Sequence, residues 1–171
     1  MAKRAGLDGL YLVGVREGPV WSAESLGLDA ATTSPHFLRR PWVSKRRPIE
    51  WLRRHYHEIA GKPTIYRYQD MISELSSNAI AEDLNFPCLV PNWDNTPRSA
   101  VNGVVFHGST PELFKVHVER VLARIRRNPP ERNLVFLKSW NEWAEGNHLE
   151  PDLKYGLGYL RVIRDAVSRD V

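Results

Sequence analysis

The sequence of 171 residues contains one cysteine, Cys88, and no long hydrophobic run. A single thiol permits no disulfide within the chain and excludes a metal site built from several thiolates. No apolar stretch reaches the roughly 18 residues that a transmembrane helix requires. Residues 1–6 also lack the apolar core of a secretory signal. These absences predict a cytoplasmic protein without a membrane span.

A large excess of charge of one sign is missing as well, because 24 lysines and arginines are balanced by 20 aspartates and glutamates. The net charge of +4 is too small to indicate a nucleic-acid partner. Basic residues gather at 39–54 and 115–132, but neither segment has the interleaved aromatic residues of an RNA-binding sheet or the spacing of a zinc finger. The favoured interpretation is a solvated basic surface, and we expect no nucleic acid among the partners.

What the sequence does contain is enough apolar residues for a core, since 42% are hydrophobic and 10% aromatic. Strand-like and helix-like segments alternate as four strand-to-helix units, without hairpin signals between paired strands. Such alternation is typical of parallel strands joined by crossover helices. The strand-like segments are 10–15, 27–33, 64–68, 87–91, 104–106 and 134–137, and helices are expected at 49–60, 69–84, 109–128 and 155–169.

Two α/β architectures have this alternation, an open doubly wound sheet and a (β/α)8 barrel of the TIM type. No glycine-rich phosphate loop follows a strand-like segment, which disfavours the nucleotide-binding open sheet, and we expect no cofactor. A complete barrel needs about 250 residues. The prediction is therefore a single partial domain, residues 1–171, that forms about the C-terminal half of a barrel. Residues 1–6 resemble the last turn of a helix and fit a chain that begins inside such a fold.

The segment Ser139–Pro151 is the most function-like part of the chain and directly follows the strand-like segment 134–137. In barrel enzymes the catalytic groups gather at this end of the strands. The segment combines indoles, carboxylates, amides and an imidazole: Trp140, Asn141, Glu142, Trp143, Glu145, Asn147, His148 and Glu150. Stability alone is a poor explanation for so many of these groups in one loop.

Glu142 and Glu145 are the candidate catalytic pair. Their spacing of three residues places both on one side of a helical turn. Two carboxylates in one pocket repel each other, so one is expected to hold a proton near neutral pH and act as an acid while the other stays ionised. The alternative is a surface pair near a helix start, with the tryptophans packed at the mouth of the barrel.

A second polar segment, Pro91–Arg98, also follows a strand-like segment and contains Asn92, Trp93, Asp94 and Asn95. Its tryptophan, like the two of the first segment, suits stacking on a sugar ring, and its amides suit sugar hydroxyls. An ion pair between Asp94 and Arg98 that only fixes the loop is an equally good interpretation.

Three smaller predictions concern other residues. The histidines and carboxylates show no metal-ligand spacing on a helix, so we expect no metal. Cys88 lies in an apolar strand-like segment and is expected to be a small core residue rather than a nucleophile. The helix at 109–128 begins either with a capping box of Ser109 and Glu112 or with Thr110 as the cap and Pro111 at the first helical position.

Several segments closely resemble the C-terminal portion of WbsX-type proteins, which are bacterial glycoside hydrolase family 99-like domains. Such domains are often found among genes of lipopolysaccharide and O-antigen biosynthesis and are often labelled glycosyltransferases. The resemblance covers roughly residues 25–169 and is carried by Tyr66–Tyr68, Pro91–Arg98, Phe106–Glu112, Ser139–Asp152 and Tyr155-Gly156. The two long segments in series make it specific.

The resemblance implies a (β/α) barrel that acts on a mannose-type or related glycan with retention of configuration. The segment Asn141–Gly146 matches the one that carries both catalytic carboxylates in family 99 endo-α-mannosidases. By this match Glu142 is the base on the 2-hydroxyl of the sugar, which displaces the leaving group through a 1,2-anhydro intermediate. Glu145 protonates the glycosidic oxygen and then activates water. The predicted substrate-binding residues are Trp93, Asp94, Asn95, Trp140, Asn141, Trp143, His148 and Glu150.

The chain departs from the family in lacking the N-terminal half of the barrel, which in family 99 supplies further sugar contacts. A half barrel leaves strand edges unpaired and one face of the core open. We therefore expect a missing N-terminal half or a second copy to complete it, in addition to a glycan substrate. Two other functions stay open: a glycosyltransferase in lipopolysaccharide or O-antigen biosynthesis, although the sequence has no Asp-x-Asp metal motif, and a non-catalytic glycan-binding module.

Overall fold

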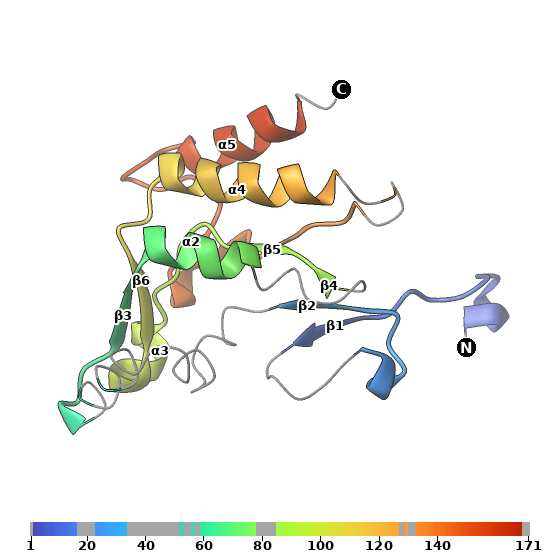
Figure 1. Ribbon diagram of the computed structural model, residues 1–171, viewed down its shortest axis with the longest axis horizontal. Helices are drawn as coiled ribbons and strands as arrows, with labels where there is room; N and C mark the ends of the chain where they lie inside the picture. Colours follow the sequence, from blue (N-terminus) through green and yellow to red (C-terminus); the bar gives the residue numbers. More distant parts are fainter. Residues whose placement is uncertain are drawn as a thin grey trace.

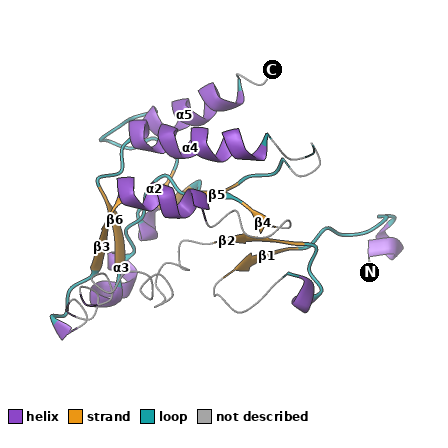
Figure 2. Ribbon diagram, viewed as in Figure 1, coloured by secondary structure: helices purple, strands orange, loops and turns teal. Residues whose placement is uncertain are grey.

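The computed structural model describes residues 2–16, 23–33, 59–77, 85–126 and 133–168, together with Leu52, Tyr56 and Pro129. Its strands are β1 (Val13–Arg16), β2 (Ala30–Thr33), β3 (Thr64–Arg67), β4 (Asn85–Phe86), β5 (Cys88–Leu89), β6 (Val104–His107), β7 (Phe136–Leu137), β8 (Asn141–Glu142) and β9 (Asn147–His148). The α-helices are α2 (Tyr68–Ser77), α3 (Thr96–Ser99), α4 (Pro111–Ile125) and α5 (Gly158–Val167), and 3-10 turns occur at η1 (Ala2–Ala5), η2 (Glu24–Leu26), η5 (Ala100–Asn102) and η7 (Trp143–Glu145). Helices α2, α4 and α5 form a layer on one side of the strands (Figures 1 and 2).

The strands that alternate with helices pair in parallel throughout the described residues, as the sequence predicts. β1 pairs with β2 and β2 with β4, while β3 pairs with β6 and β5 with β7. β4 and β5 are two parts of one segment, separated at Pro87, whose missing N–H cannot join a strand ladder. The pairings therefore form separate small groups rather than one continuous barrel wall. The sequence pattern did not predict the antiparallel hairpin of β8 and β9.

Two apolar clusters hold the helices against the strands. The first joins α2 to the strands through Tyr68, Met71, Ile72, Cys88, Val90, Trp93, Val104 and Phe106. The second joins α4, α5 and β5 through Leu89, Phe114, Val118, Val121, Leu149 and Tyr159. Burial of each large apolar side chain contributes about 1.5–3 kcal/mol to folding, so these clusters fix the strand ends from which the polar loops emerge.

Helix α4 begins as one of the two sequence predictions states. The Thr110 hydroxyl accepts a hydrogen bond from the Leu113 backbone N–H at 3.3 Å, and Pro111 occupies the first turn. The Ser109 hydroxyl is used elsewhere, because it donates to the Pro91 carbonyl oxygen. Thr110 and Pro111 therefore start the helix, and Ser109 ties it to the segment after β5.

The other helices differ in part from their predicted ranges. The helix expected at 49–60 lies largely outside the described residues, and Leu52, Tyr56 and Ile59 are exposed at 63%, 63% and 78%. The closing helix begins at Gly158 rather than near Tyr155, because residues 152–156 form a turn instead. Within the described part of the chain, no helix combines the length and apolar composition needed to cross a bilayer.

His117 is a polar side chain placed in the core. It is fully buried on the inner face of α4, its ring lies 6.4 Å from that of Phe114, and its Nδ1 is 3.3 Å from the Ser76 Oγ. Burial lowers the pKa of the His117 imidazole from its ordinary value of 6.5 to about 4, although the nearby Cys88 backbone opposes the shift. The folded protein therefore requires neutral His117.

Acidification is expected to destabilise the fold through His117. Because the unfolded chain binds a proton on this residue below pH 6.5 and the folded chain only near pH 4, the free energy of unfolding falls across this window by up to about 3 kcal/mol. Urea unfolding between pH 7 and pH 4 measures this loss. His117→Gln flattens the curve, whereas His107→Gln, at an exposed position, leaves its slope unchanged. Equal slopes for all three proteins contradict the assignment.

Candidate functional site

Two polar loops meet at the carboxyl ends of the paired strands β5 and β7. The Asn92 side chain joins them, because its Oδ1 accepts from the His148 N–H at 2.8 Å and its Nδ2 donates to the His148 carbonyl at 3.3 Å. The Asp94 N–H donates to the Glu145 carbonyl at 2.8 Å, and the Asn147 Nδ2 donates to the Asn92 carbonyl. The segment after β7 is therefore docked on the segment after β5 by backbone and amide hydrogen bonds.

Gly146 permits this close approach. It has a positive φ of 49°, and a Cβ built on it lies 3.0 Å from the Asp94 Cβ and 3.2 Å from the Asp94 backbone nitrogen. Only glycine combines this backbone conformation with so little space. The glycine of the predicted Asn141–Gly146 segment thus has a structural task at the contact between the loops.

Glu145 is buried and ion-paired. Its residue is 2% exposed, its Oε1 lies 2.7 Å from the Arg98 Nη1, and its Oε2 lies 3.8 Å from the Lys138 Nζ. One interpretation of the sequence paired Arg98 with Asp94. In the structure the Asp94 Oδ1 instead accepts hydrogen bonds from the backbone N–H and the hydroxyl of Thr96. Arg98 is thereby left to reach across to the other loop.

Glu142, three residues earlier, lies in a different environment. It is half-buried at the start of turn η7, and its backbone N–H donates to the Ser139 Oγ at 3.1 Å. Its carboxylate makes no hydrogen bond or ion pair with a described residue that would neutralise it. One short turn thus presents a buried, paired carboxylate at its end and an unpaired one at its start.

Trp143, which lies between the two glutamates in the sequence, forms an aromatic surface of fixed orientation. Its ring stacks on the His148 imidazole, with centroids 3.8 Å apart and an angle of 13° between the planes. The indole Nε1 donates to the Glu150 Oε2 at 2.7 Å, and the residue is 49% exposed. Glu150, predicted to bind substrate, therefore holds the indole in place.

Asp152 fixes the other side of this stack. Its Oδ2 lies 3.3 Å from the His148 Nε2, and its Oδ1 accepts from the backbone N–H groups of Lys154 and Tyr155. Partial burial raises the pKa of the Asp152 carboxyl, but these hydrogen bonds and the nearby imidazole together hold it below its ordinary value. Asp152 therefore stays an anion and orients His148.

A cavity of ≈ 500 Å³ adjoins this network. Its walls include four of the predicted site residues, Trp93, Asp94, Trp143 and His148, together with Asn92, His107, Ser109, Lys154, Tyr155 and Tyr159. Neither Glu142 nor Glu145 is among the lining residues, so the predicted catalytic pair lies beside this cavity rather than in it. A volume of this size accommodates a small ligand.

The remaining predicted substrate contacts lie elsewhere. Asn95 is 1% exposed, and its Oδ1 accepts from the Val104 N–H at 2.7 Å, which ties the loop to β6. Trp93 lines the cavity but is 2% exposed and packs against Phe106. Trp140 and Asn141 are exposed and do not line the cavity. Trp143 is thus the predicted indole that is both exposed and at the cavity.

Some lining residues lie outside the predicted binding set. Tyr159 is buried on α5, and its hydroxyl lies 2.8 Å from the Ser109 Oγ. Tyr155 donates its hydroxyl proton to the Ser109 carbonyl at 3.1 Å. The spacing of these tyrosines is also that of a buried helix face, so periodicity alone does not distinguish a cavity wall from core. For Cys88, burial raises the pKa of the thiol to about 11, which agrees with its prediction as a core residue.

Comparison with known proteins gives three findings. A family model described as "Glycosyltransferase WbsX" matches residues 1–163. Two proteins named "Uncharacterized protein WxcX", from two strains of Xanthomonas campestris pv. campestris, are each 25% identical over 165 residues; the match covers 96% of this chain and 23% of each relative. The chain thus spans about a quarter of the length of the curated relatives that it matches. A solved "Glycoside hydrolase-like protein" has a TM-score of 0.53 at 15% identity, over 96% of this chain and 46% of that one, which shows likeness of fold alone.

The contact at Gly146 predicts a selective loss of stability on substitution. In Gly146→Ala the alanine must adopt an unfavourable positive φ, and its Cβ clashes with Asp94. The substitution is expected to lower the free energy of unfolding by about 2–3 kcal/mol. The control is Gly156→Ala, where φ is 53° and no atom lies within 4 Å of the added Cβ, so only the backbone term of about 1 kcal/mol applies. Chemical denaturation compares the two, and equal losses contradict the close approach.

The Arg98–Glu145 ion pair predicts a measurable coupling energy. A double-mutant cycle with Arg98→Ala and Glu145→Gln is expected to give about 1–2 kcal/mol, because one partner is buried while the other is 68% exposed. The Lys115–Glu119 pair, at 3.9 Å with both side chains half-exposed, serves as the control and is expected to couple by less than about 0.5 kcal/mol. A coupling no larger than that of the control contradicts the pairing.

Proposed function

The chain belongs to the WbsX glycosyltransferase family, and we propose that it forms the C-terminal half of a (β/α)8 barrel that hydrolyses a mannose-type glycan with retention. The findings establish a carbohydrate-active family and a fold like that of a glycoside hydrolase-like protein. The proposal adds the architecture, the reaction and the residues that perform it.

One observation carries the proposal: Glu142, just before turn η7, and Glu145, the last residue of that turn, lie in unlike environments. An acid–base pair requires carboxyl groups whose surroundings differ, so that one can donate a proton while the other accepts one. Glu145 is buried against Arg98 and Lys138, whereas Glu142 is half-buried and makes no ion pair with a described residue. Both follow β7 at its carboxyl end, where barrel enzymes place their catalytic groups.

We assign the proton transfers by the resemblance to family 99 enzymes. Glu142 removes the proton from the sugar 2-hydroxyl, and Glu145 protonates the leaving oxygen and later activates water. Both oxygens of Glu145 are engaged by cations, so at least one ion pair must open on substrate entry before the Glu145 carboxyl can hold the proton that it transfers. Arg98 is the partner better able to leave, because its side chain is 68% exposed while that of Lys138 is 32% exposed.

Solvent-exposed apolar side chains at and just before β1 support the half-barrel architecture. Leu10, Tyr11, Leu12 and Val15, in and just before β1, are 45–63% exposed. An exposed hydrophobic edge is the usual site of strand addition. The structural neighbour also continues beyond the matched region, since the chain covers 46% of it. A preceding half of the same kind of fold is therefore the proposed cover, with a second copy as the alternative.

Two other functions each have one observation in their favour. The description of the family favours glycosyl transfer, which in this protein requires a sugar-nucleotide site. The absence of Glu142 and Glu145 from the cavity wall favours a glycan-binding module without turnover. We prefer hydrolysis because a module needs no acid–base pair, and a paired, buried carboxylate is costly to maintain without a task.

The reaction is tested by incubating the full chain with α-mannan and, separately, with GDP-mannose and an acceptor. Hydrolysis releases reducing ends, and proton NMR shows retention at the anomeric carbon. Glu142→Gln and Glu145→Gln are each expected to lower kcat by about 100-fold or more. Glu119→Gln, at an exposed position on α4, is the matched control with unchanged kcat.

Two outcomes contradict the proposal. Transfer from the sugar nucleotide without hydrolysis identifies a glycosyltransferase. Calorimetric binding of mannan oligosaccharides that is equal in the wild type and both glutamine variants, with no hydrolysis by any of them, identifies a binding module.

A further inference from the structure

The acidic side chains that line the cavity, Asp94 and Asp152, already accept hydrogen bonds from the protein itself. Asp152 accepts from two backbone N–H groups and lies 3.3 Å from the His148 Nε2. The Asp94 Oδ1 accepts both the N–H and the hydroxyl of Thr96. A ligand in the cavity therefore meets carboxylates with at least one oxygen each already occupied by protein hydrogen-bond donors.

The basic side chains that line the cavity make no ion pair with a described residue. The Lys154 Nζ lies 4.8 Å from the centre of the Tyr155 ring, and both residues line the cavity. Lys154 is exposed and makes no ion pair with a described residue. His107, at the carboxyl end of β6, is also exposed and lines the same cavity.

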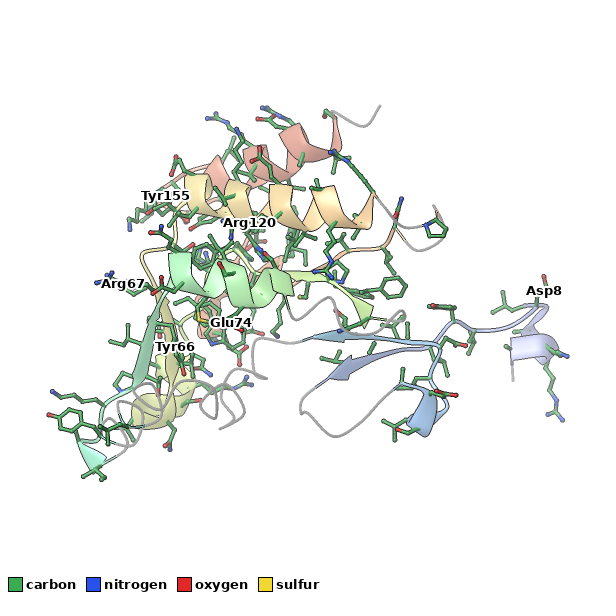
Figure 3. The ribbon with its side chains drawn as sticks, viewed as in Figure 1. Asp8, Tyr66, Arg67, Glu74, Arg120 and Tyr155 are labelled. Carbon is green, nitrogen blue, oxygen red and sulfur yellow. The ribbon has the colours of Figure 1, made fainter. Side chains whose placement is uncertain are left out.

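A third basic side chain lies beside this rim. Arg67 is the register partner of His107 in the parallel pair β3–β6, so the two residues are neighbours at the same strand end. Figure 3 labels Arg67 at the end of β3 and Tyr155 near the start of α4, toward the same side of the molecule. Arg67 forms no ion pair with a described residue. The cavity therefore combines aromatic rings with Lys154 and His107, and Arg67 lies next to it, none of them ion-paired to a described residue.

We propose that this cavity binds a sugar residue that carries an anionic group, a hexuronic acid or a sugar phosphate. The half-exposed Trp143 ring and the Tyr155 ring supply apolar surface for a pyranose face, while Lys154 meets the anionic substituent. The inference rests on the proposed function only in taking a glycan as the ligand. The reaction centre at Glu142 and Glu145 lies beside the cavity, so the anionic residue neighbours the one whose bond is cleaved.

The test compares matched neutral and acidic probes with the full chain. Calorimetry or saturation-transfer NMR at low salt measures binding of the methyl glycosides of glucose, galactose and mannose, of the corresponding uronic acids and of mannose 6-phosphate. At least one anionic form is expected to bind about five-fold more tightly than its neutral parent. High salt is expected to reduce this preference because the interacting charges are near the surface. Binding of the uronic acids or of the phosphate distinguishes the two sources of charge.

Lys154→Met is expected to abolish the preference while neutral probes bind as before, because methionine keeps the aliphatic stem and removes the charge. Lys115→Met, on α4 and away from the cavity, is the matched control and retains the preference. Circular dichroism establishes that each variant is folded. Equal binding of acidic and neutral forms overturns the inference, and so does a preference that survives Lys154→Met.

The two proposals fail separately. Glu142→Gln is expected to lose hydrolysis and to keep the preference for the anionic probe. A wild-type protein that prefers the anionic probe but hydrolyses nothing contradicts the proposed function and leaves the cavity assignment supported. A protein that hydrolyses mannan without any charge preference does the opposite.

Discussion

The site depends on the contact between the segments that follow β5 and β7. The Asn92 side chain pairs with the backbone of His148 in both directions, as a neighbouring strand would, and Gly146 lets the two segments approach to van der Waals distance. This docking holds the long loop as the β8–β9 hairpin and the short turn η7. Without it, Trp143 and Glu145 have no fixed position relative to the strand ends.

This contact explains why the carboxylates of the loop have different partners. Glu145 is directed into the protein, where Arg98 and Lys138 reach it, while Glu142 remains at the start of the turn. Glu150 and Asp152 are used to orient Trp143 and His148. A loop crowded with acidic residues is therefore stable because most of them have a donor or a cation as a partner, which leaves few charges free for a ligand.

The sequence predicts the parallel pairing and the two polar loops, and one of its two alternatives for the start of α4 is the one found. Apolar alternation and turn chemistry are local signals, and residues such as Thr110 and Pro111 act within one helical turn. The predicted half barrel is not visible as one continuous wall, because Pro87 interrupts the ladder and the strands around it are short. Among the predicted binding residues, Trp93 and Asn95 are mainly buried, since aromatic rings and amides serve a core as readily as a ligand.

The sequence by itself determined the family, the alternation of parallel strands with α2, α4 and α5, and which two loops carry the polar residues, because these follow from motif identity and local periodicity. Only the tertiary structure decided that Arg98 pairs with Glu145 rather than Asp94, that Glu150 holds the Trp143 indole, and that Lys154 lies at the cavity without an ion pair to a described residue. Each of these contacts joins side chains that compete for several possible partners of opposite charge or polarity. Which partner each side chain meets depends on distances of a few ångströms between packed loops. The spacing of residues along the chain does not specify those distances.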